Sequence, residues 1–115
     1  MNGFKKLIIN YLQKTKTMLA HHVLFWLKDD ITEAEYKEFE TAARNLENIN
    51  LAKFFHVGTP ADIVRDVVDG SYSFSLFGAF ETMEEFQAYQ KHPQHVEFLN
   101  GPNKYAKKVV IYDAD

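Results

Sequence analysis

The chain has 115 residues, of which 46% are hydrophobic and 25% charged, so it fits one ordinary globular domain. A net charge of −3, with lysine and arginine scattered among the acids, argues against a nucleic-acid partner, and the absence of cysteine excludes disulfides and thiolate chemistry. Ten Phe, six Tyr and one Trp are many large rings for a thin core, so we expect some of them at a subunit interface or in a ligand cavity.

Residues 1–17 form an N-terminal extension to a domain that we predict over residues 18–115. Lysines flank the short apolar patch Leu7-Ile8-Ile9. The patch lacks a small-residue cleavage site and is far shorter than the roughly 18 apolar residues of a membrane span, so we predict a cytoplasmic protein with no membrane partner. Met18 directly precedes the first strand-like run. The extension is therefore either a short amphipathic helix or the product of an upstream start.

The first strand and the first helix have the clearest signals. Residues 19–27 are almost all apolar or aromatic, which predicts a strand covered on both faces. Thr32 and Glu35 form a Thr-x-x-Glu capping box, which predicts the start of a helix. Apolar side chains follow at spacings of three and four, at Tyr36, Phe39, Ala43 and Leu46.

The second half of the chain repeats this order. Alternating side chains and turn residues predict strands over residues 53–58, 72–80 and 108–113. Residues 61–70 mix acids with Ile and Val and form either a long loop or an extension of a strand. A second capping box, Thr-Met-Glu-Glu, opens a helix over residues 82–92.

The element order β-α-β-β-α-β predicts the α+β class, with a ferredoxin-like protomer whose antiparallel four-stranded sheet carries two helices on one face. Both faces of the first strand are apolar, and two helices can cover only one of them. We expect a second copy of the sheet to cover the other face. That arrangement is a symmetric homodimer, a dimeric α+β barrel.

One short segment, Tyr89-Gln90-Lys91-His92-Pro93-Gln94-His95, has the composition of a reactive site. A spacing of three places Tyr89 and His92 on one helical face, and a residue before proline is disfavoured in the α region. The helix should therefore end at His92, and a short turn from Pro93 would bring His95 back toward Tyr89. A phenol and an imidazole facing one apolar cavity can donate and accept protons.

Four segments of the chain resemble the stress-responsive dimeric α/β-barrel (Dabb) domain. They are residues 21–28, 73–82, 89–95 and 109–113, and the resemblance runs from about Met18 to the C-terminus. It implies a ferredoxin-like protomer whose sheet packs on that of its twin, with a cavity between sheet and helices. It also implies a small-molecule-binding protein. Most members of the family have no established activity, so the resemblance assigns no substrate.

One plant member of that family closes a linear polyketide by an aldol condensation, using the tyrosine and the second histidine of the corresponding motif. Carried across by motif, the resemblance implies that Tyr89 and His95 are the catalytic pair, with no cofactor. A fixed catalytic imidazole needs an orienting partner, for which Asp113 and Glu97 are candidates. The remaining candidates, for substrate binding, are His21, Val23, Phe25, Phe86 and His92.

Other interpretations of the same residues stay open. His92 can simply end a helix, Tyr89 can be a core aromatic, and histidines on a buried strand can be hydrogen-bonded core groups. The protein would then be a non-enzymatic stress-responsive dimer or a ligand-binding protein. We predict no metal site, because Pro93 interrupts the histidine spacing that zinc sites use. Related dimeric barrels include haem-degrading monooxygenases with one axial histidine, so a haem-binding barrel is a further alternative, with His95 as the ligand.

Overall fold

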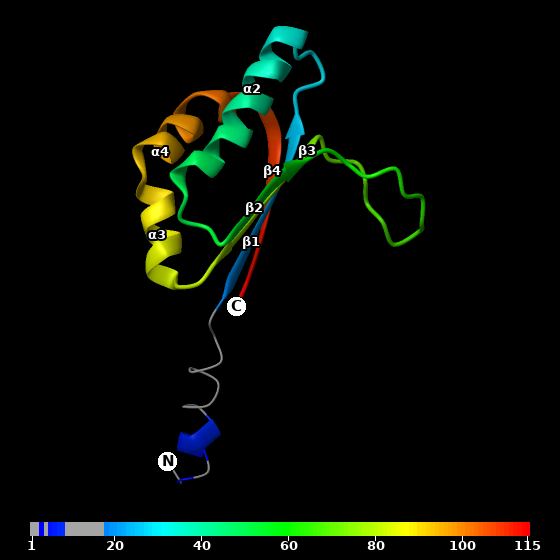
Figure 1. Ribbon diagram of the computed structural model, residues 1–115. Helices are drawn as coiled ribbons and strands as arrows, with labels where there is room; N and C mark the ends of the chain where they lie inside the picture. The colour runs from blue at the N-terminus through cyan, green and yellow to red at the C-terminus, as the bar shows by residue number, and fades with distance from the viewer. Residues whose placement is uncertain (1–2, 4, 9–17) are drawn as a thin grey trace.

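The computed structural model describes residues 3, 5–8 and 18–115, so most of the predicted N-terminal extension lies outside the described residues. Among the described residues, no helix is both long and apolar enough to cross a membrane. From residue 19 onward the elements follow the predicted order, with one further helix before the last strand (Figure 1). They are β1 (Leu19–Leu27), α2 (Glu33–Asn45), β2 (Phe54–Gly58), β3 (Phe74–Phe80), α3 (Met83–Lys91), α4 (Pro93–Asn100) and β4 (Ala106–Ala114), with short 3-10 turns at Leu46–Ile49 and Pro102–Tyr105.

The four strands form one sheet in the order β2-β3-β1-β4, and every neighbouring pair is antiparallel. Helices α2, α3 and α4 all cover the same face of this sheet (Figure 1). The predicted ferredoxin-like protomer is thus confirmed. Because β1 is central, its alternate side chains from Leu19 to Leu27 are buried under the helices, and those between them are half-buried on the other face.

Aromatic rings fill the layer between sheet and helices. Phe39 of α2 is completely buried, and its ring centroid lies 5.1 Å from that of Phe25, 5.5 Å from Phe74 and 5.6 Å from Phe98. Ring pairs of this kind contribute about 0.5–1.5 kcal/mol each beyond the burial of their area. One helix residue therefore ties two strands and α4 together.

Threonine side chains cap the starts of α2 and α3, as the sequence predicts. The Thr32 hydroxyl accepts a hydrogen bond from the Glu35 N–H at 3.1 Å, and the Glu35 carboxylate accepts one from the Thr32 N–H at 3.0 Å. The hydrogen bonds that the Glu35 carboxylate accepts from Thr32, first from its backbone N–H, hold the pKa of Glu35 below its usual value. Of the second predicted box the structure shows the Thr82 half, in which its hydroxyl accepts from the Glu85 N–H at 3.1 Å. Both side chains satisfy amides that a helix leaves unpaired at its start.

The chain after Pro93 differs from the prediction of a short turn. His92 leaves the helical region with ψ near 136°, as a residue before proline should, but Pro93 then begins the eight-residue helix α4. The His92 Nδ1 accepts a hydrogen bond from the Gln94 N–H at 3.1 Å and so caps this helix. The Gln94 amide donates to the Asn45 carbonyl at 2.6 Å, which ties α4 to the end of α2. Tertiary contacts of this kind stabilise a helix that has only two turns.

The sheet face opposite the helices is also rich in apolar side chains. It carries Leu24 and Trp26 from β1, Phe77 from β3, and Val110 and Tyr112 from β4. Tyr112 is 64% exposed, whereas the other four are half-buried. No helix covers this face in the part of the chain that the structure describes (Figure 1).

Residues 59–73 form a long loop that we call the arm, rather than the strand extension that the sequence also allows. The arm projects away from the sheet on the side opposite the helices (Figure 1). Its Val64 and Val67 are 96% and 81% exposed, and its base is held by a 3.1 Å hydrogen bond from the Trp26 indole to the Ser71 hydroxyl. The arm therefore adds apolar surface on the same side as the open sheet face.

Candidate functional site

A cavity of about 270 Å³ lies between the sheet and the helices α3 and α4. Its walls are largely apolar, and they include Val23 and Phe25 of β1, Phe98 of α4, and Val109 and Ile111 of β4. Its polar lining residues are His21, Tyr89, Gln90, His95 and Asn103. A mostly apolar cavity with a few convergent polar groups is the usual form of a small-molecule site.

Three separate elements bring the proton-handling side chains together. His21 comes from β1, Tyr89 from α3 and His95 from α4. The Tyr89 ring centroid lies 4.8 Å from that of His95 and 6.5 Å from that of His21. The break at His92 and Pro93 makes this possible, because six residues along an unbroken helix would rotate His95 by about 240° from Tyr89.

The geometry of His95 fixes which nitrogen can act as a base. Its Nδ1 lies 2.9 Å from the Gln90 carbonyl oxygen. Because a carbonyl only accepts, Nδ1 carries the hydrogen and Nε2 has the free lone pair. Burial lowers the pKa of His95, the Gln90 carbonyl opposes that shift, and the nearby His21 adds to it. The imidazole is therefore neutral at neutral pH, the state in which it can accept a proton.

The orienting partner of His95 is thus a backbone carbonyl, and neither Asp113 nor Glu97 as the sequence suggested. Asp113 instead pairs with His21, whose Nδ1 lies 2.6 Å from the Asp113 carboxylate oxygen. The two residues are direct cross-strand partners in β1 and β4. His21 is 4% exposed, so the carboxylate satisfies a buried ring nitrogen and leaves only Nε2 for contact with a ligand.

Tyr89 supplies a hydroxyl that stays protonated. The residue is 2% exposed, and burial raises the pKa of its phenol well above the usual value. Its ring packs on Phe80 at 5.1 Å between centroids, and in the described part of the chain no group hydrogen-bonds its hydroxyl. Tyr89 can therefore act as a hydrogen-bond donor to a bound oxygen.

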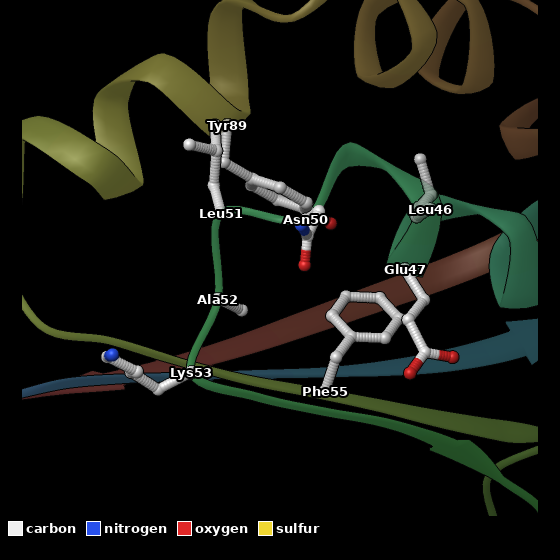
Figure 2. A pocket seen from close by; sticks show the side chains of 8 residues that line it. All are labelled: Leu46, Glu47, Asn50, Leu51, Ala52, Lys53, Phe55 and Tyr89. Atoms are coloured by element: carbon white, nitrogen blue, oxygen red, sulfur yellow. The ribbon is translucent and has the colours of Figure 1, made fainter.

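A second hollow of about 160 Å³ lies on the other side of Tyr89 (Figure 2). Figure 2 shows the Tyr89 side chain extending over it from α3, while Phe55 rises from β2 on the opposite side. Leu46 and Tyr89 line both this hollow and the main cavity. The two side chains therefore form the partition between the spaces.

The other sequence-predicted site residues lie at different distances from the cavity. Val23 and Phe25 line it. Phe86 packs under His21 with ring centroids 4.9 Å apart, and His92 caps α4; neither is a lining residue. In the described part of the chain, no group of three or more His, Cys, Asp or Glu side chains is placed to hold a metal ion.

Comparison with known families identifies the family of this chain. Residues 19–115 match the family described as the stress responsive A/B barrel domain, or Dabb. The chain belongs to this family. The Dabb match covers every strand and helix from β1 to β4.

Proteins similar to this Dabb protein in sequence or in fold include named enzymes. It is 31% identical over 95 residues to the olivetolic acid cyclase of Cannabis sativa, an alignment that covers 83% of this chain and 93% of the relative. The hydroxynitrile lyase of Passiflora edulis has the same fold, with a TM-score of 0.70 and 20% identity over 86% of this chain and 93% of that one. A dimeric ferredoxin-like protein of unknown function from Thermobifida fusca gives a TM-score of 0.68 and 23% identity, covering 84% and 89% of the two chains.

Sequence reasoning missed two features of the Dabb cavity. Gln90 contributes its backbone carbonyl, which no side-chain pattern could reveal. Asn103 lines the cavity from the turn before β4, where its type signals only a loop. The pairing of His21 with Asp113 was open to prediction, because the alignment of the first and last strands in an antiparallel pair fixes it.

Proposed function

We propose that this Dabb protein is a cofactor-independent acid–base catalyst that acts on a small aromatic or polyketide-like carbonyl compound, as an aldol-type cyclase or lyase. The observation that carries the proposal is the meeting of Tyr89, His95 and His21 in one apolar cavity. A cyclase and a lyase among the relatives support the same class of chemistry.

In the proposed reaction His95 is the base and Tyr89 is the donor. The Nε2 atom of His95 takes a proton from the carbon beside a carbonyl, and the Tyr89 hydroxyl hydrogen-bonds the enolate oxygen that forms. The enolate carbon attacks a second carbonyl, and the imidazolium returns its proton to the new alkoxide. General acid–base groups contribute about 10²–10⁴-fold each, so positioning in the cavity must supply the rest.

His21 is a third polar contact for the same substrate. Asp113 holds its ring through Nδ1, so Nε2 has a fixed place in the lining. A preorganised imidazole beside the phenol can hydrogen-bond a carbonyl or hydroxyl oxygen without reorganising during the reaction. The Asp113 carboxylate therefore acts as a positioning group through His21.

Replacement of the two proposed catalytic residues is the direct test. The assay follows retro-aldol cleavage of a fluorogenic aromatic β-hydroxyketone, in which His95 removes the hydroxyl proton, the carbon–carbon bond breaks, and the imidazolium protonates the enolate. Tyr89→Phe and His95→Ala should each lower kcat/KM by about 10²-fold or more, because each removes a proton-transfer group.

Two controls make that result decisive. The variants should melt within a few degrees of the wild type, since the ring of Tyr89 and the fold around His95 remain. His22→Ala changes a histidine next in sequence to His21 but on the opposite sheet face, and should keep its activity. A wild-type rate equal to the buffer rate, or variants as active as the wild type, would contradict catalysis at this site.

We also propose that the protein is a homodimer that packs through the open sheet face. The half-buried apolar side chains on that face, which include Leu24, Phe77 and Val110, support this arrangement. The dimeric relative from Thermobifida fusca, which shares the fold, supports it as well. A twofold axis would let the same patch serve both subunits.

A further inference from the structure

The cavity is lined by a residue with an unpaired polar atom that the proposed mechanism does not use. Asn103 lies in the 3-10 turn Pro102–Tyr105 and lines the cavity. Its side-chain Oδ1 is buried and has no hydrogen-bond partner among the described residues. Most buried side-chain polar atoms are paired, and an unpaired one lowers the stability of the fold. A cavity-lining residue whose side-chain amide oxygen is unpaired suggests a role in binding, because a turn of the amide presents either of its polar atoms to a ligand.

Asn103 lies at the opposite end of the cavity from His21. Along β1, His21 pairs with Asp113 and Phe25 pairs with Val109, and these pairs are about 13 Å apart at a rise of about 3.3 Å per residue. The turn that holds Asn103 leads directly into β4 beyond Val109, and its Tyr105 carbonyl accepts a 2.9 Å hydrogen bond from the Lys28 N–H at the end of β1. The cavity is therefore polar at both ends.

Apolar side chains separate these two ends. Val23, Phe25, Phe98 and Ile111 all line the cavity and offer no hydrogen bonds from their side chains. A matching ligand has a carbonyl near Tyr89 and His95, an apolar middle, and one polar group at its far end. A purely apolar tail would leave the Asn103 amide buried without a partner, which disfavours binding.

We propose that Asn103 is a specificity-determining residue that selects carbonyl substrates bearing a hydroxyl at the end remote from the reacting carbon. A hydroxyl suits the site because it both donates and accepts, so it pairs with either atom of the amide whichever way the side chain is turned. The inference rests on the proposed function, since it assumes that the cavity holds the substrate with its carbonyl beside Tyr89.

A matched pair of probes tests the inference by binding alone. The probes are para-pentylbenzaldehyde and its analogue with a hydroxyl on the terminal carbon of the pentyl chain, titrated calorimetrically into the full chain. The hydroxylated probe should bind the wild type about twofold to tenfold more tightly, the gain from one neutral hydrogen bond. In Asn103→Leu this preference should disappear, and the affinity for para-pentylbenzaldehyde should hold or rise.

Asn100→Leu is the matched control, because it makes the same change at an exposed position on α4 outside the cavity. It should keep the preference for the hydroxylated probe. Asn103→Leu should melt at or above the wild-type temperature, because it removes an unpaired buried atom. A lower melting temperature would make Asn103 a structural residue and overturn the inference.

The outcomes also separate this inference from the proposed function. Equal binding of both probes to the wild type, or a preference that survives in Asn103→Leu, overturns the role of Asn103 and leaves catalysis by Tyr89 and His95 intact. A preference that depends on Asn103 in a protein without retro-aldol activity supports the inference as a binding property and overturns catalysis. Failure of both probes to bind the wild type overturns the cavity as the ligand site, and both proposals with it.

Discussion

The chemistry of each histidine in the cavity depends on its burial and on the group that its Nδ1 atom contacts. His95 and His21 are the same side chain, yet one donates from Nδ1 to a neutral carbonyl and the other pairs with a carboxylate. The motif around residue 89 predicts that a tyrosine and a histidine meet, and the 4.8 Å ring separation agrees. It cannot predict the Gln90 carbonyl, because the direction of a backbone group depends on how α3 ends.

The lowered pKa of His95 predicts the pH dependence of the proposed reaction. Because burial lowers this pKa below its usual value of about 6.5, the imidazole stays neutral, and kcat/KM stays high, down to a pH below 6.5. Activity is lost as the pH falls through the His95 pKa. The measurement is the pH profile of kcat/KM on the β-hydroxyketone, together with the NMR titration of the His95 ring.

The NMR titration has an internal control, because the His95 signal should be missing in His95→Ala. The lowered pKa of His95 also affects the free energy of unfolding. As the pH falls from above 6.5, the unfolded chain binds a proton at this residue before the folded chain does, so the free energy of unfolding decreases. An acid limb at or above pH 6.5 would contradict the buried position of the imidazole.

At the scale of elements, strands and the starts of α2 and α3 follow from local chemistry, whereas α4 depends on tertiary contact as well. The capping hydroxyls of Thr32 and Thr82, the apolar run of β1 and the alternation in β3 are local signals, and the structure agrees with them. Residues 93–100 lack a strong helical pattern of their own. They become a helix because Pro93 begins it, His92 caps it, and Phe98 anchors it in the core. Local capping and tertiary contact together decide the structure of this segment.

Pro93 is predicted to position the proposed catalytic pair, Tyr89 and His95. Without it α3 could continue, which would rotate His95 away from Tyr89. Pro93→Ala should lower kcat/KM for the β-hydroxyketone at least tenfold. It should also destabilise the fold by about 0.4–1 kcal/mol, through the greater freedom of the unfolded chain. Urea unfolding and the retro-aldol assay measure the two effects separately.

Pro60→Ala is the matched control for this change, since Pro60 lies in the arm and away from the cavity. It should cause a similar small loss of stability and leave kcat/KM unchanged. Full activity in Pro93→Ala would show that the path of the chain from Tyr89 to His95 does not depend on the proline.

At the scale of the whole molecule, the two faces of the sheet have different surroundings. The helices enclose the cavity with one face of β1, while the other face presents apolar side chains to the exterior. The aromatic surplus in the sequence is partly explained by the core around Phe39 and partly by Trp26 and Phe77 on the open face. Composition could predict that an extra surface exists, but strand pairing was needed to say which side chains form it.

Val110→Asp is predicted to separate the proposed dimer. Val110 of the edge strand β4 pairs with Leu24 of β1 on the open face, and a carboxylate there would face apolar groups of the second subunit in the proposed dimer. Desolvating an unpaired charge opposes association strongly, so light scattering on a sizing column at micromolar concentration should show a dimer for the wild type and a monomer for the variant.

Val96→Asp makes the same substitution on α4, on the helix side of the sheet, and should remain dimeric. A monomeric wild type would contradict the sheet-to-sheet arrangement, and a dimeric Val110→Asp would move the interface to another surface, for which the exposed arm is the next candidate.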